Sequence, residues 1–267
     1  MPSLLLFASL LLPTSDDQGE FSPRVRVVRA TYRLEHPKTS GTGFLLQRAT
    51  PPGSKEPSLL LVTAAHAFEK MNTDRATLVL RTRNEEGGWD AAPTEIPIRQ
   101  GMKKRWRRHP KVDVAALPLS LPEEVAVESL PVSMLATESD WEESQLEPGS
   151  LVWSIGFPHA SLFKPSKAAF PLTRLGCIAS YPLHPPEDHR TFLVDYNSFE
   201  GDSGGPITAE LVSGGISQLK IIGLVHGQHF IDEKYKLVYA EGKLRKRLGL
   251  ATVTHSKAIL ETIAMPK

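Results

Sequence analysis

One glycine-rich stretch decides how the rest of this chain is interpreted, and it reads Phe199-Glu200-Gly201-Asp202-Ser203-Gly204-Gly205-Pro206. A serine that acts as a nucleophile must project its hydroxyl into a cleft beside backbone N–H donors, and small neighbours make this possible. Gly201 permits a backbone in which the N–H groups of Gly201 and Ser203 point toward one position, where a developing oxyanion would be stabilised. The same stretch is also compatible with a hairpin connection, in which Ser203 is only a turn hydroxyl.

Two further segments favour the nucleophile. The apolar, β-prone run at residues 59–62 leads through small residues into His66, and Asp113 stands at the head of a short apolar strand. Together they supply a base, an orienting carboxylate and a nucleophile in the order histidine, aspartate, serine. The separations, 113 − 66 = 47 and 203 − 113 = 90 residues, suit one β-barrel followed by a second. Asp195 and Asp202 remain competing candidates for the carboxylate, and His66 taken alone could be a core histidine.

The residues that carry a family resemblance are Thr63-Ala64-Ala65-His66, Asp113-Val114-Ala115 and the stretch from Gly201 to Pro206, with Gly41-Thr42-Gly43-Phe44 upstream. On these residues the chain resembles serine proteases of the trypsin/chymotrypsin fold. It is most similar in style to bacterial members without disulfides, such as the glutamyl endopeptidases and the high-temperature-requirement proteases, and no PDZ domain is expected.

The resemblance implies an all-β fold of two antiparallel six-stranded β-barrels, with the active site between them and a short C-terminal helix. It also implies a serine endopeptidase that works through an acyl-enzyme without a cofactor. His66 would be the general base, Asp113 would orient it, Ser203 would be the nucleophile, and the N–H groups of Gly201 and Ser203 would form the oxyanion hole.

By the same resemblance, the floor of the primary specificity pocket lies six residues before Ser203, at Asn197, and the wall comes from Val225, His226, Gly227 and Gln228. A neutral amide on the floor disfavours strict cleavage after arginine or lysine, because it supplies no buried carboxylate. His226 resembles the histidine by which glutamyl endopeptidases bind an acidic residue, but counted from Gly223 it is displaced by one position. A backbone-ordering or solvent-facing role for His226 stays open.

Asp202 raises a separate question. In family members that are activated by cleavage, this aspartate pairs with a newly released amino terminus. The chain has no Arg/Lys-Ile-Val-Gly-Gly sequence before its first expected strand, and Arg24-Val25 is a poor substitute. We therefore expect Asp202 to meet another cation or polar group, without a proteolytic activation step.

Composition excludes several function classes. Of the 267 residues, 40% are hydrophobic and 23% are charged, which is typical of a soluble globular protein. A net charge of +1 gives no field that would attract nucleic acid or a membrane. The single cysteine, Cys177, excludes an intramolecular disulfide and is expected to be a small buried residue. The 9 histidines are scattered, with none at metal-ligand spacing, so no metal is expected.

The apolar run from Leu4 to Leu12 is too short to span a bilayer as a helix, and it favours a secretory signal. No Lys or Arg precedes this run and no Ala-x-Ala site follows, so a hydrophobic strand or a misassigned start codon remains an alternative. We expect a secreted or periplasmic bacterial protein. The expected division is a leader at 1–20, an N-terminal barrel at 21–125, a linker at 126–150, a C-terminal barrel at 151–252 and a helix at 253–267, capped by Thr254.

Strands are expected at Arg24–Leu34, Thr77–Arg81, Glu95–Arg99, Thr191–Asp195 and Gln218–His226. The basic stretch at 103–109 includes Trp106 and invites a nucleic-acid interpretation, but the charge balance of the chain favours a solvated face.

The partner we expect is a protein or peptide substrate, with no nucleic acid and no stable membrane insertion, and the chain should be a monomer. Two alternatives remain, a catalytically silent binding or scaffold protein and an enzyme with esterase-like chemistry that processes one dedicated partner.

Overall fold

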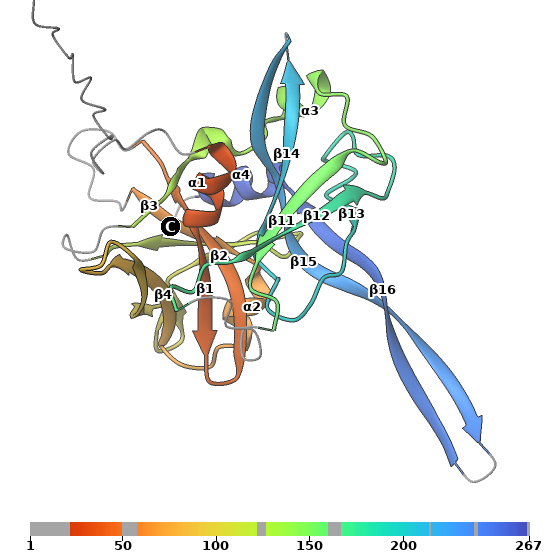
Figure 1. Cartoon of the computed structure of the whole chain (residues 1–267), viewed down its shortest axis with the longest axis horizontal. Helices are drawn as coiled ribbons and strands as arrows, with labels where there is room; N and C mark the ends of the chain where they lie inside the picture. The colour runs from red at the N-terminus through yellow and green to blue at the C-terminus, as the bar shows by residue number, and fades with distance from the viewer. Residues whose placement is uncertain are drawn as a thin grey trace, which may run out of the picture.

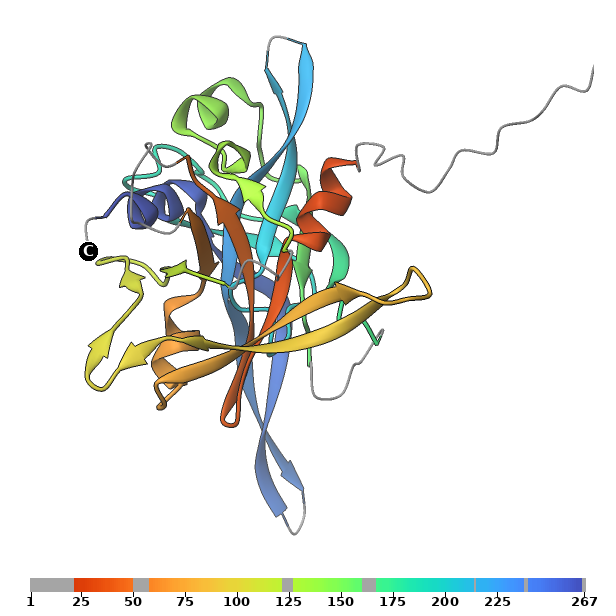
Figure 2. The same ribbon diagram turned by 90° about the vertical axis from the view of Figure 1, so that its left-hand side faces the viewer.

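The computed structural model describes residues 22–49, 58–121, 127–159, 167–213, 215–237 and 240–265. Two groups of strands lie side by side, small helices lie around them, and one long hairpin projects away from the body (Figures 1 and 2). The expected leader at 1–20 lies outside the described residues. In the described part of the chain, no helix is both long enough and apolar enough to cross a membrane.

The first half is an eight-stranded sheet whose path runs β5-β4-β1-β2-β3-β9-β8, with β10 paired in parallel to β2. Within the described residues, β5 and β8 are its ends and do not pair with each other. The strands are β1 Thr31–His36, β2 Thr39–Gln47, β3 Leu59–Thr63, β4 Arg75–Arg83, β5 Trp89–Pro97, β8 Arg107–Arg108, β9 Ala115–Leu119 and β10 Leu130–Pro131, beside a separate pair, β6 Arg99–Gln100 and β7 Lys103–Lys104.

The second half is a closed barrel in the order β11-β12-β13-β16-β15-β14. Its strands are β11 Leu151–Gly156, β12 Leu172–Ile178, β13 Thr191–Asp195, β14 Pro206–Ser213, β15 Ile216–Leu237 and β16 Ala240–His255. Closure removes the free edges of the sheet, and the predicted all-β class is confirmed. The strand predicted at Gln218–His226 covers only part of the first half of β15, which runs far beyond the barrel.

The helices are short, and they are α1 Pro23–Arg29, α2 Ala65–Lys70, the 3-10 turn η1 Val132–Met134, α3 Glu138–Glu143 and α4 Ser256–Ala264. The strand predicted from Arg24 is wrong over its first part, because α1 occupies it. Ser22 accepts a hydrogen bond from the Val25 N–H and Pro23 stands in the first turn, so the start signals override the β preference of the valines. Val27 is fully buried on this helix, and its packing stabilises α1.

The C-terminal helix is confirmed, but Thr254 as its cap is wrong. Strand β16 continues to His255, and Thr254 pairs with Leu224 inside the barrel. The ring Nδ1 of His255 accepts the N–H of Lys257 at 3.1 Å and caps α4 instead. An acceptor side chain at this position satisfies one of the free N–H groups of the first turn.

One apolar cluster joins the two halves. It combines Phe44 and Leu60 of the first sheet with Ile155 and Ile221 of the barrel, and Ile259 of α4 packs into it. Each half also has a cluster of its own. The site between the halves is therefore set by packing that both of them share.

The basic stretch at 103–109 is only partly solvent-facing, contrary to expectation. Trp106 is 5% exposed and packs on Phe68, with ring centroids 5.5 Å apart. Arg107 donates to the carbonyl of Ile263 at 3.2 Å, and His109 is buried. The aromatic ring that would stack on a base is therefore part of the core. Cys177 is likewise half-buried, not fully buried.

Candidate active site

His66 and Asp113 form a two-point contact. The Asp113 carboxylate accepts the backbone N–H of His66 at 2.9 Å and the ring Nδ1–H at 2.5 Å. Because a carboxylate only accepts, Nδ1 carries the proton and Nε2 is left as the acceptor, as a general base requires. Burial raises the pKa of Asp113, but the hydrogen bonds from His66 outweigh this and leave the pKa below its ordinary value.

Position on the fold explains this pairing. His66 is the second residue of α2, directly after β3, and Asp113 precedes β9, the neighbour of β3 in the sheet. The two residues are 47 apart in sequence, and the sheet brings them to the same end of adjacent strands.

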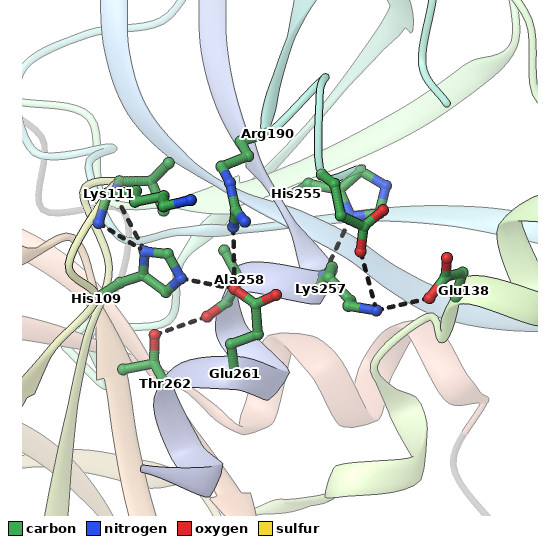
Figure 3. Close-up of polar contacts among 11 residues, drawn as sticks. His109, Lys111, Glu138, Arg190, His255, Lys257, Ala258, Glu261 and Thr262 are labelled. Atoms are coloured by element: carbon green, nitrogen blue, oxygen red, sulfur yellow. Dashed lines mark hydrogen bonds and ion pairs between the residues drawn. The ribbon is translucent and has the colours of Figure 1, made fainter. Parts of the chain in front are cut away.

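His109 holds the turn that carries Asp113 (Figure 3). Its Nδ1 accepts the N–H groups of Lys111 and Val112, both at 3.1 Å, and its Nε2–H donates to Glu261 of α4 at 2.7 Å. Arg190 pairs with the same Glu261 carboxylate at 3.0 Å. The C-terminal helix thus fixes the loop of the orienting carboxylate, a link that sequence reasoning missed.

The turn of Ser203 lies against the segment that leads to His66. A Cβ on Gly204 would lie 2.0 Å from the carbonyl oxygen of Thr42 and 3.0 Å from the N of Ala64, so only glycine fits there. The φ of Gly204 is +91°, a conformation that glycine adopts without strain. Within the described part of the chain, the Ser203 hydroxyl makes no hydrogen bond; such contacts are often long before substrate binds.

Thr42 ties the turn to the first half. Its Oγ1 donates to the carbonyl of Gly201 at 2.7 Å and accepts the N–H of Phe157 at 3.1 Å, while its own N–H donates to the Ser203 carbonyl at 2.9 Å. Thr63 in turn donates to the Thr42 carbonyl at 2.7 Å. These partners lie far apart in sequence, so the glycine motif around Thr42 indicated a turn but not this role.

The hydrogen bonds around Glu200 fix the orientation of the peptide that carries the Gly201 N–H, one of the two predicted oxyanion donors. The carbonyl of Glu200 accepts the N–H of His159 at 2.7 Å. In a planar trans peptide the N–H points opposite to the carbonyl, so the N–H of Gly201 is turned to the other side, away from His159. Gly201 has φ +98°, and a Cβ there would lie 2.2 Å from the Phe157 carbonyl oxygen. Among the described residues, neither this N–H nor that of Ser203 donates to a backbone carbonyl.

Asp202 pairs with Arg174, the cation that the sequence left unidentified. The guanidinium contacts the Asp202 carboxylate, which also accepts the N–H of Phe199 at 2.7 Å. Asp202 is 1% exposed, and burial raises its pKa even though Arg174 lowers it in part. Arg174, a residue of strand β12, thus supplies the positive charge that pairs with the buried carboxylate in the Ser203 turn.

The predicted pocket residues lie on two segments of the chain, with Asn197 just after β13 and the others on β15. Asn197 is exposed and lies beside Gly249, with its Oδ1 3.6 Å from where a Gly249 Cβ would be. Val225 is buried, and Gly227 and Gln228 follow it along β15.

His226 lies close enough to interact electrostatically with both Asp113 and His66, and its Nδ1 is 2.8 Å from the Thr254 hydroxyl. Burial lowers the pKa of His226. His226 therefore lies near the His66–Asp113 pair. The described residues hold no group of three or more His, Cys, Asp or Glu side chains that could bind a metal ion.

The arrangement of the closed barrel, the first sheet and the C-terminal helix is the trypsin/chymotrypsin-like fold. The solved structures that resemble it include two of Rv3671c. The first, from M. tuberculosis H37Rv in the inactive form of a serine-to-alanine mutant, has a TM-score of 0.50 and 16% identity, over 90% of this chain and 87% of that chain. The second, an inactive form of the Rv3671c protease, has a TM-score of 0.49 and 17% identity, over 91% and 95%. No family model and no curated protein matches the sequence.

Proposed function

We propose that the chain is a serine endopeptidase in which His66, Asp113 and Ser203 form the catalytic triad. The observation that carries the proposal is the two-point His66–Asp113 contact at the end of β3, beside a glycine turn in which, among the described residues, the N–H groups of Gly201 and Ser203 donate to no backbone carbonyl. The similarity in fold to Rv3671c, which was solved as a serine-to-alanine mutant in an inactive form, supports hydrolysis through a serine.

In the proposed reaction, the Ser203 oxygen attacks the carbonyl carbon of the scissile bond while His66 Nε2 takes the hydroxyl proton. The N–H groups of Gly201 and Ser203 stabilise the oxyanion, at about 3 kcal/mol or more per donor in known cases. The C–N bond then breaks, the leaving amine takes the proton from His66, and an ester on Ser203 remains. Water attacks this ester, again through His66, and releases the acid.

No proteolytic activation is part of the proposal. The Arg174 guanidinium supplies the positive charge for Asp202, and the His159 N–H holds the Glu200 carbonyl away from the donor side. Detection of an inactive precursor that gains activity on cleavage near Val25 would contradict this.

A fluorophosphonate that labels activated serines tests the proposal. We expect labelling of the wild type and none of Ser203→Ala, while Ser133→Ala, which removes an exposed hydroxyl on η1, labels normally. Digestion of a peptide library then reports which residue precedes the cleaved bond. A folded wild type that does not label would favour the binding or scaffold alternative. Labelling without cleavage of any library peptide would favour an enzyme for one dedicated partner.

A further inference from the structure

The hairpin of β15 and β16 extends beyond the barrel as a two-stranded ribbon (Figures 1 and 2). Its register pairs Phe230 with Arg247 at the base and Leu237 with Ala240 near the tip. The barrel needs β15 only as far as its pairing with β14 and with the part of β16 that also pairs with β13. The ribbon therefore contributes little to the core, and any function that it has depends on its surface.

Within the described residues both edges of this ribbon are unpaired, and the edge of β15 begins at the turn of Ser203. Strand β14 pairs with β15 only as far as Leu224. The next residue, Val225, exchanges hydrogen bonds with the turn itself, from the Gly204 N–H at 2.7 Å and to the Gly205 carbonyl at 2.9 Å. From His226 onward, no strand of the described residues pairs with β15 on that side. A long free edge is a template for another strand.

The direction of such a strand follows from the fold. A substrate whose scissile bond lies at Ser203 can continue along β15 only away from Leu224, because β14 occupies the edge before it. The proposed pocket wall at 225–228 holds the residue before the scissile bond. The residues preceding that bond would then run toward Ser203 while β15 runs away from it, which is antiparallel pairing.

The charges of the ribbon are unbalanced. Each of its three acidic residues has a cation of the ribbon beside it, in the pairs Asp232–Arg245, Glu233–Lys246 and Glu241–Lys236. Lys234 and Lys243 stand directly opposite each other and have no partner within the described residues. Like charges in opposite positions destabilise a ribbon, and an anion between them would relieve this.

The opposite face of the ribbon carries three exposed apolar side chains around the Glu233–Lys246 ion pair. Ile231, Tyr235 and Leu244 lie on it, with 47%, 49% and 51% of their surfaces exposed. A strand added at the edge of β15 would present alternate side chains to the two faces. One set would meet Lys234 and Lys243, and the other set would meet the apolar side chains.

We propose that the free edge of β15 binds, as an added antiparallel strand, the polypeptide segment that precedes the scissile bond, and that it favours acidic side chains alternating with apolar ones. Lys234 is 234 − 226 = 8 residues along β15 from His226. The acidic positions would therefore lie about six to ten residues before the cleaved bond, some 25 Å from it along an extended strand. This inference rests on the proposed peptidase function, and it names the substrate class of that site.

Three fluorogenic peptides with the same cleavage sequence test it. One is short, one has ten more residues before the bond with alternating Glu and Val, and one has alternating Gln and Val. We expect kcat/KM for the acidic extension to exceed that for the short peptide by about tenfold at low salt, and the gain to fall as salt rises. N-methylation of alternate amides in the extension should reduce the gain, because it removes main-chain donors.

The double variant Lys234→Glu/Lys243→Glu should lose this gain and cleave the short peptide as the wild type does. Lys103→Glu/Arg105→Glu makes the same charge change at exposed positions of the first half and should keep the gain.

If the extensions give no gain while the short peptide is cleaved, the lysines only protect a free edge and the proposal is overturned. If the short peptide is not cleaved, the proposed function fails first. Sedimentation as a dimer with the β15 edge protected from hydrogen exchange would assign the edge to a second copy and overturn the proposal.

Discussion

Among single residues, Asp202 is a buried carboxylate that stands in the chain between the two proposed oxyanion donors, Gly201 and Ser203. Its raised pKa reflects that burial, and the Arg174 guanidinium is what keeps the ionised form in place. Removing one partner of a buried pair leaves the other charge without compensation. The position of the Gly201 and Ser203 N–H groups therefore depends on a residue in β12.

Arg174→Met is expected to destabilise the protein by about 3 kcal/mol and to slow fluorophosphonate labelling of Ser203 by at least about tenfold. The measurements are urea unfolding and the rate of labelling. Arg174→Met/Asp202→Asn removes both charges and should recover part of the stability.

Arg75→Met serves as the control, since Arg75 and Glu95 form an exposed ion pair on β4 and β5, and its loss should cost less than about 1 kcal/mol. Labelling at the wild-type rate in Arg174→Met would show that Arg174 does not position the turn.

At the level of elements, helix α4 is capped by a buried histidine, His255, that must stay neutral. His255 is 1% exposed and stacks on Trp141 with ring centroids 4.1 Å apart. Burial, with smaller contributions from His184 and Lys257, lowers the pKa of His255 to about 3. An unfolded histidine titrates near pH 6.5, so the folded state binds fewer protons below that value. The stability that His255 contributes is complete above about pH 6.5 and is lost as the pH falls toward 3.

His255→Asn keeps an acceptor at the cap of α4 but cannot be protonated. Between pH 7 and pH 4, we expect the free energy of unfolding of the wild type to fall by about 3 kcal/mol more than that of the variant. Urea unfolding at a series of pH values measures the difference. Parallel curves for the two proteins would show that folding does not lower the pKa of His255.

For the whole molecule, the shared cluster predicts that both halves unfold together. Leu60 of the first sheet and Ile221 of the barrel are both fully buried in that cluster. Calorimetry should give one transition whose calorimetric and van't Hoff enthalpies agree. Leu60→Ala should lower stability by about 2 to 5 kcal/mol and increase hydrogen exchange in β11 and β13 as well as in β3. Two separate transitions would contradict the shared core.

Local sequence predicted the parts of this molecule that depend on neighbours in the chain. The glycines around Ser203 indicated a turn with a positive φ, and the apolar run before His66 indicated a buried strand, because residue type alone imposes both. Thr42, His109 and Arg174 were not identified, since each acts on a group that only packing brings near. Helix α1 was missed because the strand prediction followed the β preference of its valines, whereas the Ser22 cap, Pro23 and the burial of Val27 together favour the helix. The length of the β15–β16 ribbon follows from cross-strand pairing, which alternation in one strand does not reveal.

The hydrogen bonds that Thr42 makes to the Ser203 turn predict how the two halves would behave as separate polypeptides. The turn of Ser203 belongs to the second half, yet the groups that fix its carbonyls come from β2. If the two halves were produced as separate polypeptides, neither would contain both the nucleophile and the strand that orients it. Catalysis would return only on their reassociation, so the pair would act as a complementation reporter in which turnover measures assembly.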